Sequence, residues 1–301
     1  MTRSSRGTSD GGTGRLPDFI VVGPPRTGTT WLYRALRGHV GLPQGYKETD
    51  FFTRNYSKGL DWYRGLFAEC RAGQPCGELS PGYFASVAAR ERIARAIPGC
   101  AIVAIFRAPV ARAYSFYKLM RLRGWTDLDF EPALDRYPGL AEANRYGFHL
   151  AAYEALFGEK NTLALNYDEL AAAPERFLAR ACEFIGVAPI ALEGTGLNGK
   201  RVNQVLHAPR SVRLASRAWQ VRSWLEARRA TATIELLRRL GFWRLSFKGG
   251  PAPERLDPQL EARLRERFAP EVEALEQLTG WNLSHWKLSA AATGVAARAG
   301  A

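Results

Sequence analysis

A glycine-rich segment near the N-terminus combines backbone and cationic groups that could bind a phosphate. The apolar run Phe19–Val22 ends at Gly23, four residues follow, and Gly28 comes next with Arg26 between the two glycines. A loop that joins a strand to a helix directs backbone N–H groups and the positive end of the helix dipole at an anion. We therefore expect a phosphate site formed by consecutive loop residues: Arg26, Thr27, Gly28, Thr29 and Thr30.

The loop lacks the lysine that nucleoside triphosphatases place after the second glycine. That lysine neutralises the β and γ phosphates, and the hydroxyl after it binds Mg²⁺. Here Thr29 stands in the lysine's place, and Arg26 supplies the cation earlier in the loop. This arrangement favours a ligand with one 5′-phosphate and a different group beyond it, bound without a metal.

A second cation and hydroxyl follow another apolar run. Arg107 comes directly after Ala101–Phe106, and Ser115 lies eight residues further on, in an expected helix that begins at Pro109. If the two apolar runs are neighbouring parallel strands, these side chains lie at the same rim as the first loop. They could then hold a second phosphate, whereas an arginine in a surface ion pair is the alternative.

Three short apolar runs have the length and composition of buried parallel strands. They span 19–22, 101–106 and 162–167, and each is followed by a helical pattern, the last over 169–186. Such alternation predicts an α/β fold, a P-loop-like doubly wound parallel sheet flanked by helices, with ligands at the carboxyl ends of the strands. We expect one domain over 17–286, a disordered leader over 1–16 and a flexible tail over 287–301.

The C-terminal part of the chain is expected to be helical. Residues 213–240 are rich in arginine and carry an apolar stripe of Leu214, Ala218, Val221 and Leu225. A surface helix packed on the sheet is the favoured interpretation, and a membrane-facing or partner-binding helix is the alternative. Residues 256–280 have the pattern of two helices that are separated at Pro270.

The composition narrows the classes of ligand and the cellular location. Lys and Arg number 42 against 29 Asp and Glu, and the net charge of +13 favours nucleotides, sulfated or phosphorylated substrates, nucleic acid or an anionic membrane. No signal peptide and no apolar stretch of about 18 residues is present, so we expect a cytoplasmic protein. The four cysteines are too few for a disulfide framework, and we interpret them as reduced core thiols: Cys70, Cys76, Cys100 and Cys182.

Together these motifs resemble those of the sulfotransferases that use 3′-phosphoadenosine 5′-phosphosulfate (PAPS), especially the heparan sulfate N- and 3-O-sulfotransferases and bacterial sulfotransferases. The family's 5′-phosphosulfate loop is similar to GPPRTGTTWL, and its 3′-phosphate element is similar to FRAPVARAYSFY. The resemblance implies that the loop from Arg26 to Thr30, Arg107 and Ser115 bind PAPS and its product, adenosine 3′,5′-bisphosphate (PAP), without a metal. GLNGKRVN resembles the basic loop that closes over the nucleotide, which adds Lys200 and Arg201.

The segment YKETDFF resembles the one that presents a catalytic glutamate in the glycosaminoglycan-type branch. The resemblance implies that Glu48 is the general base and that Arg26 stabilises the departing bisphosphate. Lys47 either steers the sulfate or forms a surface pair with Glu48. The implied reaction moves a sulfuryl group to a hydroxyl, or as a second choice an amine, of a small-molecule, glycolipid or saccharide acceptor. The high alanine and arginine content suggests a bacterial genome, and we therefore expect a role in bacterial specialised metabolism.

Two departures from that branch concern acceptor recognition. GELSPGYF resembles the acceptor-side segment, but Leu79 stands where the branch often carries a lysine. Asp50, two residues after Glu48, stands where a histidine is frequent. The chain therefore lacks one cation and one imidazole that the resemblance would otherwise imply.

Two other function classes remain as alternatives. A nucleotide or metabolite kinase of the P-loop type would need the loop lysine that Thr29 replaces. A non-catalytic nucleic-acid binder would fit the positive charge, but no nucleic-acid-binding motif is present, so we expect no nucleic-acid partner. The oligomeric state is left open.

Overall fold

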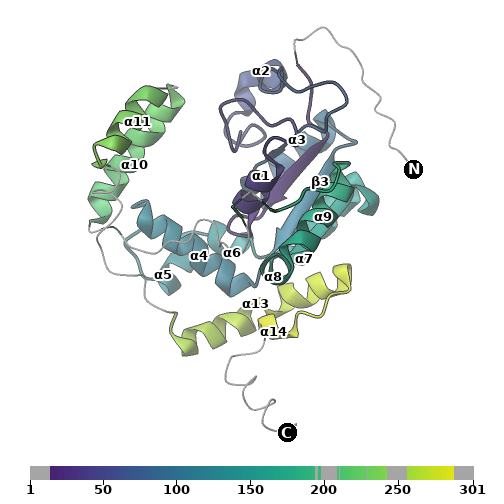
Figure 1. Cartoon of the computed structure of the whole chain (residues 1–301). Coiled ribbons are helices and arrows are strands. Elements are labelled where there is room, and N and C mark those ends of the chain that lie inside the picture. Colours follow the sequence, from purple (N-terminus) through teal and green to yellow (C-terminus); the bar gives the residue numbers. More distant parts are fainter. Residues whose placement is uncertain are drawn as a thin grey trace.

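The fold is built around a parallel β-sheet of four strands in the order β2-β1-β3-β4 (Figure 1). The computed structural model describes residues 14–193, 196–197, 209, 211–228, 230–242 and 256–287. The predicted α/β class with a parallel sheet flanked by helices is confirmed. The strands are β1 (Phe19–Gly23), β2 (Gly77–Leu79), β3 (Ala101–Phe106) and β4 (Thr162–Asn166).

The central strand β1 is buried on both faces, which explains its unbroken apolar sequence. Ile20 and Val22 belong to the core cluster on one face of the sheet, and Phe19 and Val21 belong to the cluster on the other. Successive residues of a strand point to opposite faces, so a strand covered on both sides has no polar position. The two clusters therefore define the two helical layers.

One face of the sheet is covered by α1 (Thr29–Leu36) and α9 (Pro174–Ile185), whose apolar residues join the same core cluster. The other face is covered by α3 (Val87–Ala96), α7 (Tyr146–Phe157) and α13 (Pro258–Thr279). Helix α13 packs closely on α7, because a Cβ added to Gly147 would lie 2.4 Å from the Cβ of Ala274. The C-terminal helix is thus part of the main core.

The remaining elements connect the strands or lie around the sheet and its covering helices. They comprise short 3₁₀ turns and helices: η1 (Tyr56–Lys58), α2 (Gly59–Gly65), η2 (Pro81–Tyr83), α4 (Pro109–Leu122), α5 (Phe130–Arg136), α6 (Gly139–Glu142), η3 (Glu159–Asn161), α8 (Tyr167–Ala172), α10 (Val212–Ala227), α11 (Thr231–Arg239) and α14 (Ser284–Lys287). None of the described helices is both long and apolar enough to cross a bilayer.

Two expectations about element boundaries are wrong, and one strand was missed. Helix α13 runs continuously through Pro270, because buried side chains on both sides of the proline, including Phe268 and Val272, pack it as one element. The pattern over 169–186 forms parts of two helices, since Pro174 begins α9 after α8 has ended. The short strand β2 inside GELSPGYF was not predicted.

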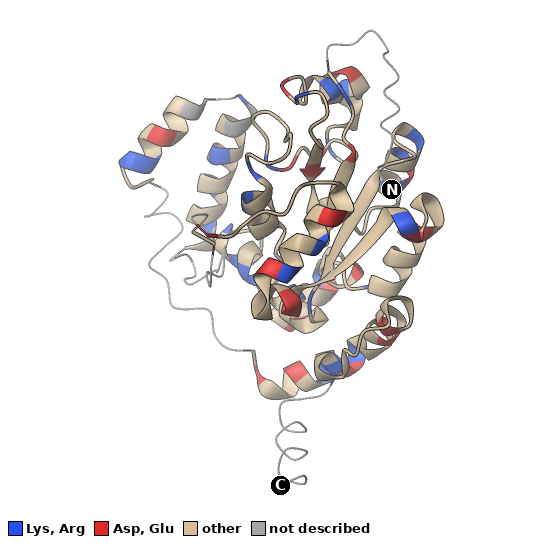
Figure 2. Cartoon of the chain, turned by 45° about the vertical axis from the view of Figure 1, so that its right-hand side comes forward, with Lys and Arg blue, Asp and Glu red and all other residues tan. Residues whose placement is uncertain are grey.

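The basic segment 213–240 forms two helices, α10 and α11, which lie apart from the sheet (Figure 1). Lysine or arginine residues occur on both helices (Figure 2). The prediction that this segment packs on the sheet is wrong: α10 packs on α4 and α11 instead. Within the predicted apolar stripe, Ala218 and Leu225 are buried, whereas Leu214 and Val221 are exposed. The buried face follows the packing of α10 on α4 and α11, which the helical period alone does not reveal.

Candidate functional site

The loop between β1 and α1 has the backbone geometry of an anion cradle. Gly28 adopts φ +98°, and a Cβ there would lie 2.8 Å from the side chain of Leu170. Both the backbone conformation and the lack of space therefore favour glycine at this position. The buried Thr27 hydroxyl donates a hydrogen bond to the carbonyl of Pro24 at 2.7 Å, which fixes the loop. Helix α1 begins at Thr29, and the N–H groups of a first helical turn have no partner within the helix.

Arg26 has a strained backbone, and its side chain reaches α4, the helix that follows β3. Its φ of +75° lies in the left-handed region that non-glycine residues rarely adopt. Its Nε donates a hydrogen bond to the Oγ of Ser115 on α4 at 3.0 Å. The cation of the first loop and the hydroxyl of the second element are therefore in direct contact.

Arg107 completes this group from the end of β3. Its guanidinium donates to the backbone carbonyl of Arg26 at 3.1 Å and lies 4.7 Å from the ring centroid of Tyr167. Strands β1 and β3 are hydrogen-bonded neighbours, so their carboxyl ends meet at one edge. The structure thus brings together Arg26, Arg107 and Ser115, as the sequence analysis expected; we call these three residues the donor cradle.

A further cation faces the donor cradle. Lys118 lies one helical turn after Ser115 on α4, and its pKa is lowered by burial and then by the positive charges of Arg107 and Arg26. The pKa of Arg26 is lowered by burial and by Arg107. Cations held within each other's field favour an anionic ligand that relieves their repulsion. Sequence analysis missed Lys118, although its three-residue spacing from Ser115 was a usable signal.

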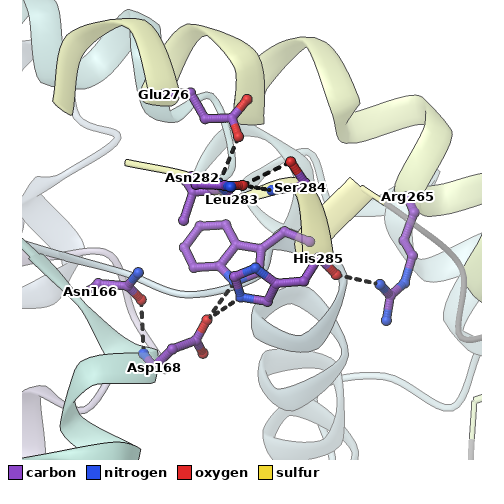
Figure 3. A network of polar contacts seen from close by, with 9 residues as sticks. Asn166, Asp168, Arg265, Glu276, Asn282, Leu283, Ser284 and His285 are labelled. Atoms are coloured by element: carbon purple, nitrogen blue, oxygen red, sulfur yellow. Dashed lines mark hydrogen bonds and ion pairs between the residues drawn. The ribbon is translucent and has the colours of Figure 1, made fainter. Parts of the chain in front are cut away.

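The C-terminal segment supports the edge of the sheet on which Tyr167 lies. Asp168, the residue after Tyr167, accepts hydrogen bonds from His285 Nε2 at 2.8 Å and from Trp286 Nε1 at 2.6 Å (Figure 3). The Asn166 side chain accepts from the Asp168 N–H at 2.8 Å and caps α8. Residues far apart in the chain therefore hold Tyr167 beneath the Arg107 guanidinium.

Glu48 lies in an irregular segment, with its side chain exposed. In the described part of the chain its ion-pair partner is Lys47, with Nζ and Oε1 2.5 Å apart. Of the two roles considered for Lys47, the surface pair is the one that the structure shows. Glu48 is thus not among the residues that contact one another in the donor cradle.

A buried carboxylate holds the segment that carries Glu48. Glu78 on β2 is fully buried and accepts hydrogen bonds from the hydroxyls of Thr49, Tyr63 (2.9 Å) and Ser80 (3.1 Å). Burial raises the pKa of Glu78, and these hydrogen bonds oppose the rise. Since Thr49 is the neighbour of Glu48, the network fixes the backbone beside the exposed carboxylate. Its members, which we call the Glu78 network, were not predicted.

The two departures from the glycosaminoglycan-type branch have distinct environments. Leu79 is fully buried in the core cluster on the side of α1 and α9, so it adds no polar group to the site. Asp50 has φ +47°, and burial raises its pKa first, while Arg54 lowers it and Glu48 raises it. A second carboxyl group therefore lies within the field of Glu48.

Two of the predicted cofactor-binding residues, Lys200 and Arg201, lie outside the described residues. Within the described ranges, no group of three or more His, Cys, Asp or Glu side chains could hold a metal ion.

Comparison with known proteins identifies the family. The family model of the sulfotransferase domain matches residues 16–209, more than half of the chain. Heparan sulfate glucosamine 3-O-sulfotransferase 6 of Mus musculus is 31% identical over 184 residues, which cover 58% of this chain and 54% of the relative. Bifunctional heparan sulfate N-deacetylase/N-sulfotransferase 4 of Mus musculus is 29% identical over 202 residues, which cover 58% of this chain and 23% of the relative.

A solved structure extends the likeness of fold beyond the family match. The sulfotransferase from Alicyclobacillus acidocaldarius superimposes with a TM-score of 0.64 at 20% identity and covers 91% of this chain and 100% of that one. The chain spans about half or less of the length of the two curated relatives. The motifs that surround the donor cradle lie inside the matched residues, and the chain belongs to the sulfotransferase domain family.

Proposed function

We propose that this protein transfers a sulfuryl group from PAPS to an acceptor hydroxyl and releases PAP. The observation that carries the proposal is the convergence of Arg26, Arg107 and Ser115 at the carboxyl ends of two adjacent parallel strands. A nucleotide with phosphates at both its 5′ and 3′ positions needs two anion sites a fixed distance apart. The backbone cradle at Gly28 supplies the first, and Arg107 with Ser115 supplies the second.

The chemistry of sulfuryl transfer accounts for the missing loop lysine. The transferred group carries one formal negative charge, and the leaving group is a nucleotide bisphosphate, so the reaction needs a cation at the leaving oxygen but no bridging Mg²⁺. Arg26 provides that cation within the loop. Because its guanidinium also contacts Ser115, Arg26 links the two phosphate positions.

Glu48 is the proposed general base. The acceptor hydroxyl must lose its proton as it attacks the sulfur, and an exposed carboxylate is accessible to an incoming acceptor. The Glu78 network supports this role, because it fixes the backbone at Thr49 while leaving the Glu48 side chain at the surface.

The proposed acceptor is the hydroxyl of a saccharide, a glycolipid or another small molecule, with an amine as the second choice. Relatives named for sulfation of heparan sulfate glucosamine support a saccharide. Aromatic side chains near the Glu48 segment, such as Tyr46 packed edge-on against Trp62, would suit a sugar face. We place the enzyme in the cytoplasm of a bacterium and in specialised metabolism, in keeping with the abundance of alanine and arginine in the chain.

Thermal unfolding in the presence of different ligands tests the proposal. PAP should raise the melting temperature in excess EDTA, because binding to the folded state alone stabilises it. Stabilisation by ATP that requires Mg²⁺ would instead support a kinase, and salt-sensitive stabilisation by oligonucleotides would support a nucleic-acid binder. Mass spectrometry of extracts supplied with enzyme and PAPS should then reveal an acceptor that gains one sulfuryl group.

A further inference from the structure

Two of the four cysteines have their sulfur atoms side by side at the end of the sheet opposite the donor cradle. Cys70 and Cys76 lie in the segment between α2 and β2, and their Sγ atoms are 3.0 Å apart. A disulfide bond is about 2.05 Å long, so closing this gap takes a shift of about 1 Å. Cys100 is buried in the same core cluster as Cys76, and Cys182 is buried in the cluster on the other face of the sheet.

The backbone around the two thiols is fixed from both sides. Cys76 donates its N–H to the Asp18 carboxylate at 2.9 Å and accepts the Asp18 N–H at 2.7 Å. Cys70 packs over Gly41, where an added Cβ would lie 2.3 Å from the Cys70 Sγ. The Gly41 N–H in turn donates to the carbonyl of Pro75 at 2.9 Å. The two sulfur atoms are therefore brought together by the packing and backbone hydrogen bonds of the fold.

The two thiols differ in reactivity. Cys70 is only partly buried, and its pKa is lowered first by the hydrogen bond from the Cys76 thiol and then by the charge of Arg15. The pKa of Cys76 is raised, first by the same hydrogen bond. Since the thiolate is the nucleophile in disulfide exchange, Cys70 attacks first. Once Cys70 is capped, the hydrogen bond that raises the pKa of Cys76 most is gone, although burial still raises it.

We propose that Cys70 and Cys76 form a reversible disulfide, a modification site separate from the sulfuryl-transfer site. The Cys70 thiolate attacks one sulfur of an oxidised low-molecular-weight disulfide such as glutathione disulfide, and one glutathione leaves. Cys76 then attacks the Cys70 sulfur and releases the second glutathione. Two electrons and two protons pass from the cysteines to the glutathione disulfide, so the step balances.

The Cys70–Cys76 disulfide would link the start of β2 covalently to the segment that follows α2. Gly77, the residue after Cys76, pairs with Phe19 at the first position of β1, whereas the donor cradle lies at the other end of these strands. The disulfide should therefore stabilise the fold without changing PAPS-dependent turnover. A short closed loop of this kind should raise the melting temperature by roughly 5 °C.

Peptide mapping of the native full-length protein tests this directly. The protein is equilibrated with mixtures of reduced and oxidised glutathione, quenched in acid, alkylated and digested with trypsin without reduction. Cleavage after Arg64, Arg71 and Arg90 leaves Cys70 and Cys76 on separate peptides, so the bond appears as one linked pair. We expect the linked pair, two alkylated cysteines instead of four, and the higher melting temperature.

Variants separate the paired cysteines from the others. Cys70→Ser should abolish both the linked peptide and the shift in melting temperature, whereas Cys182→Ala should retain both. Four alkylated thiols in every mixture, including pure glutathione disulfide, would overturn the proposal. So would a glutathione adduct that persists on Cys70, or a linked pair that forms only in denaturant.

Discussion

The donor cradle and the Glu48 segment differ in whether the proposed functional side chains are held in place by hydrogen bonds from other elements. In the donor cradle, Arg26 after β1 donates a hydrogen bond to Ser115, and Arg107 after β3 donates one to the backbone carbonyl of Arg26. In the Glu48 segment, the fixed carboxylate is the buried Glu78, while Glu48 itself is exposed and paired with the adjacent Lys47. The proposed donor site therefore lies at the edge of the sheet, whereas the proposed general base lies on a loop.

Under the proposed function, this difference should separate ligand binding from proton transfer. Substitutions in the donor cradle should affect nucleotide affinity, because its groups are proposed to bind the nucleotide in the ground state and the transition state alike. Substitution of Glu48 should affect turnover alone. The predictions below test that separation.

Glu48→Gln should lower turnover by about 10²–10⁴-fold, because the amide keeps the shape of the side chain but cannot accept a proton. Its affinity for PAP, measured by calorimetry, should remain near native. Pre-steady-state assays, in which the chemical step limits the rate, measure the loss of turnover.

Glu131→Gln, which alters another exposed glutamate in an ion pair, is the matched control and should leave turnover unchanged. If Glu48→Gln kept more than about a tenth of native turnover where chemistry limits the rate, Glu48 would not be the base. Asp50→Asn would then be the next variant to measure.

Arg26→Ala should reduce both turnover and PAP affinity, the affinity by about 1.5–3 kcal/mol, the range for a charge-assisted hydrogen bond. Arg26→Lys should recover part of the affinity, because the charge remains while the Nε contact with Ser115 is lost. A loss of turnover in Arg26→Ala with native PAP affinity would show that the residue does not bind the donor.

Glu78 should make the free energy of unfolding depend on pH. Burial raises its folded pKa above the unfolded value, so between the two values the folded state holds the extra proton. Stability should fall as the pH rises through that window, by at most about 1.4 kcal/mol per pH unit. Glu78→Gln should flatten this dependence in urea unfolding, whereas Glu131→Gln should not. An unchanged slope in Glu78→Gln would assign the effect to another group.

Lys118→Met should produce the smallest effect, a loss of PAP affinity of roughly threefold, because the side chain is only partly buried and solvent screens its charge. The same substitution should slightly raise the melting temperature of the ligand-free protein, since it relieves repulsion by Arg26 and Arg107. A lower melting temperature of the ligand-free variant would contradict the idea that these cations repel one another.

The sequence predicts the donor cradle better than the Glu48 segment for a physical reason. The strand, loop and helix around Gly28 are local, and the rule that parallel strands share a carboxyl edge is enough to bring Arg107 to Arg26. The burial of Glu78 depends on Thr49 and Tyr63, which are distant in sequence, so no local pattern reveals it.

The helical errors have a similar origin. Pro270 predicts a break, yet packing of α13 on α7 keeps the helix continuous. The apolar stripe from Leu214 to Leu225 has the period of a helix, as α10 does, but packing on α4 and α11 decides which part of that stripe is buried. Long-range packing thus overrides the local signal in both places.

The most direct test of the donor cradle compares two nucleotides that differ only in the 3′-phosphate. Isothermal titration calorimetry in EDTA should show that the native protein binds PAP more tightly than 5′-AMP. Arg107→Ala should weaken PAP binding by about 1.5–3 kcal/mol and leave 5′-AMP binding unchanged. Equal affinity of the native protein for the two nucleotides would contradict the assignment of Arg107 and Ser115 to the 3′-phosphate.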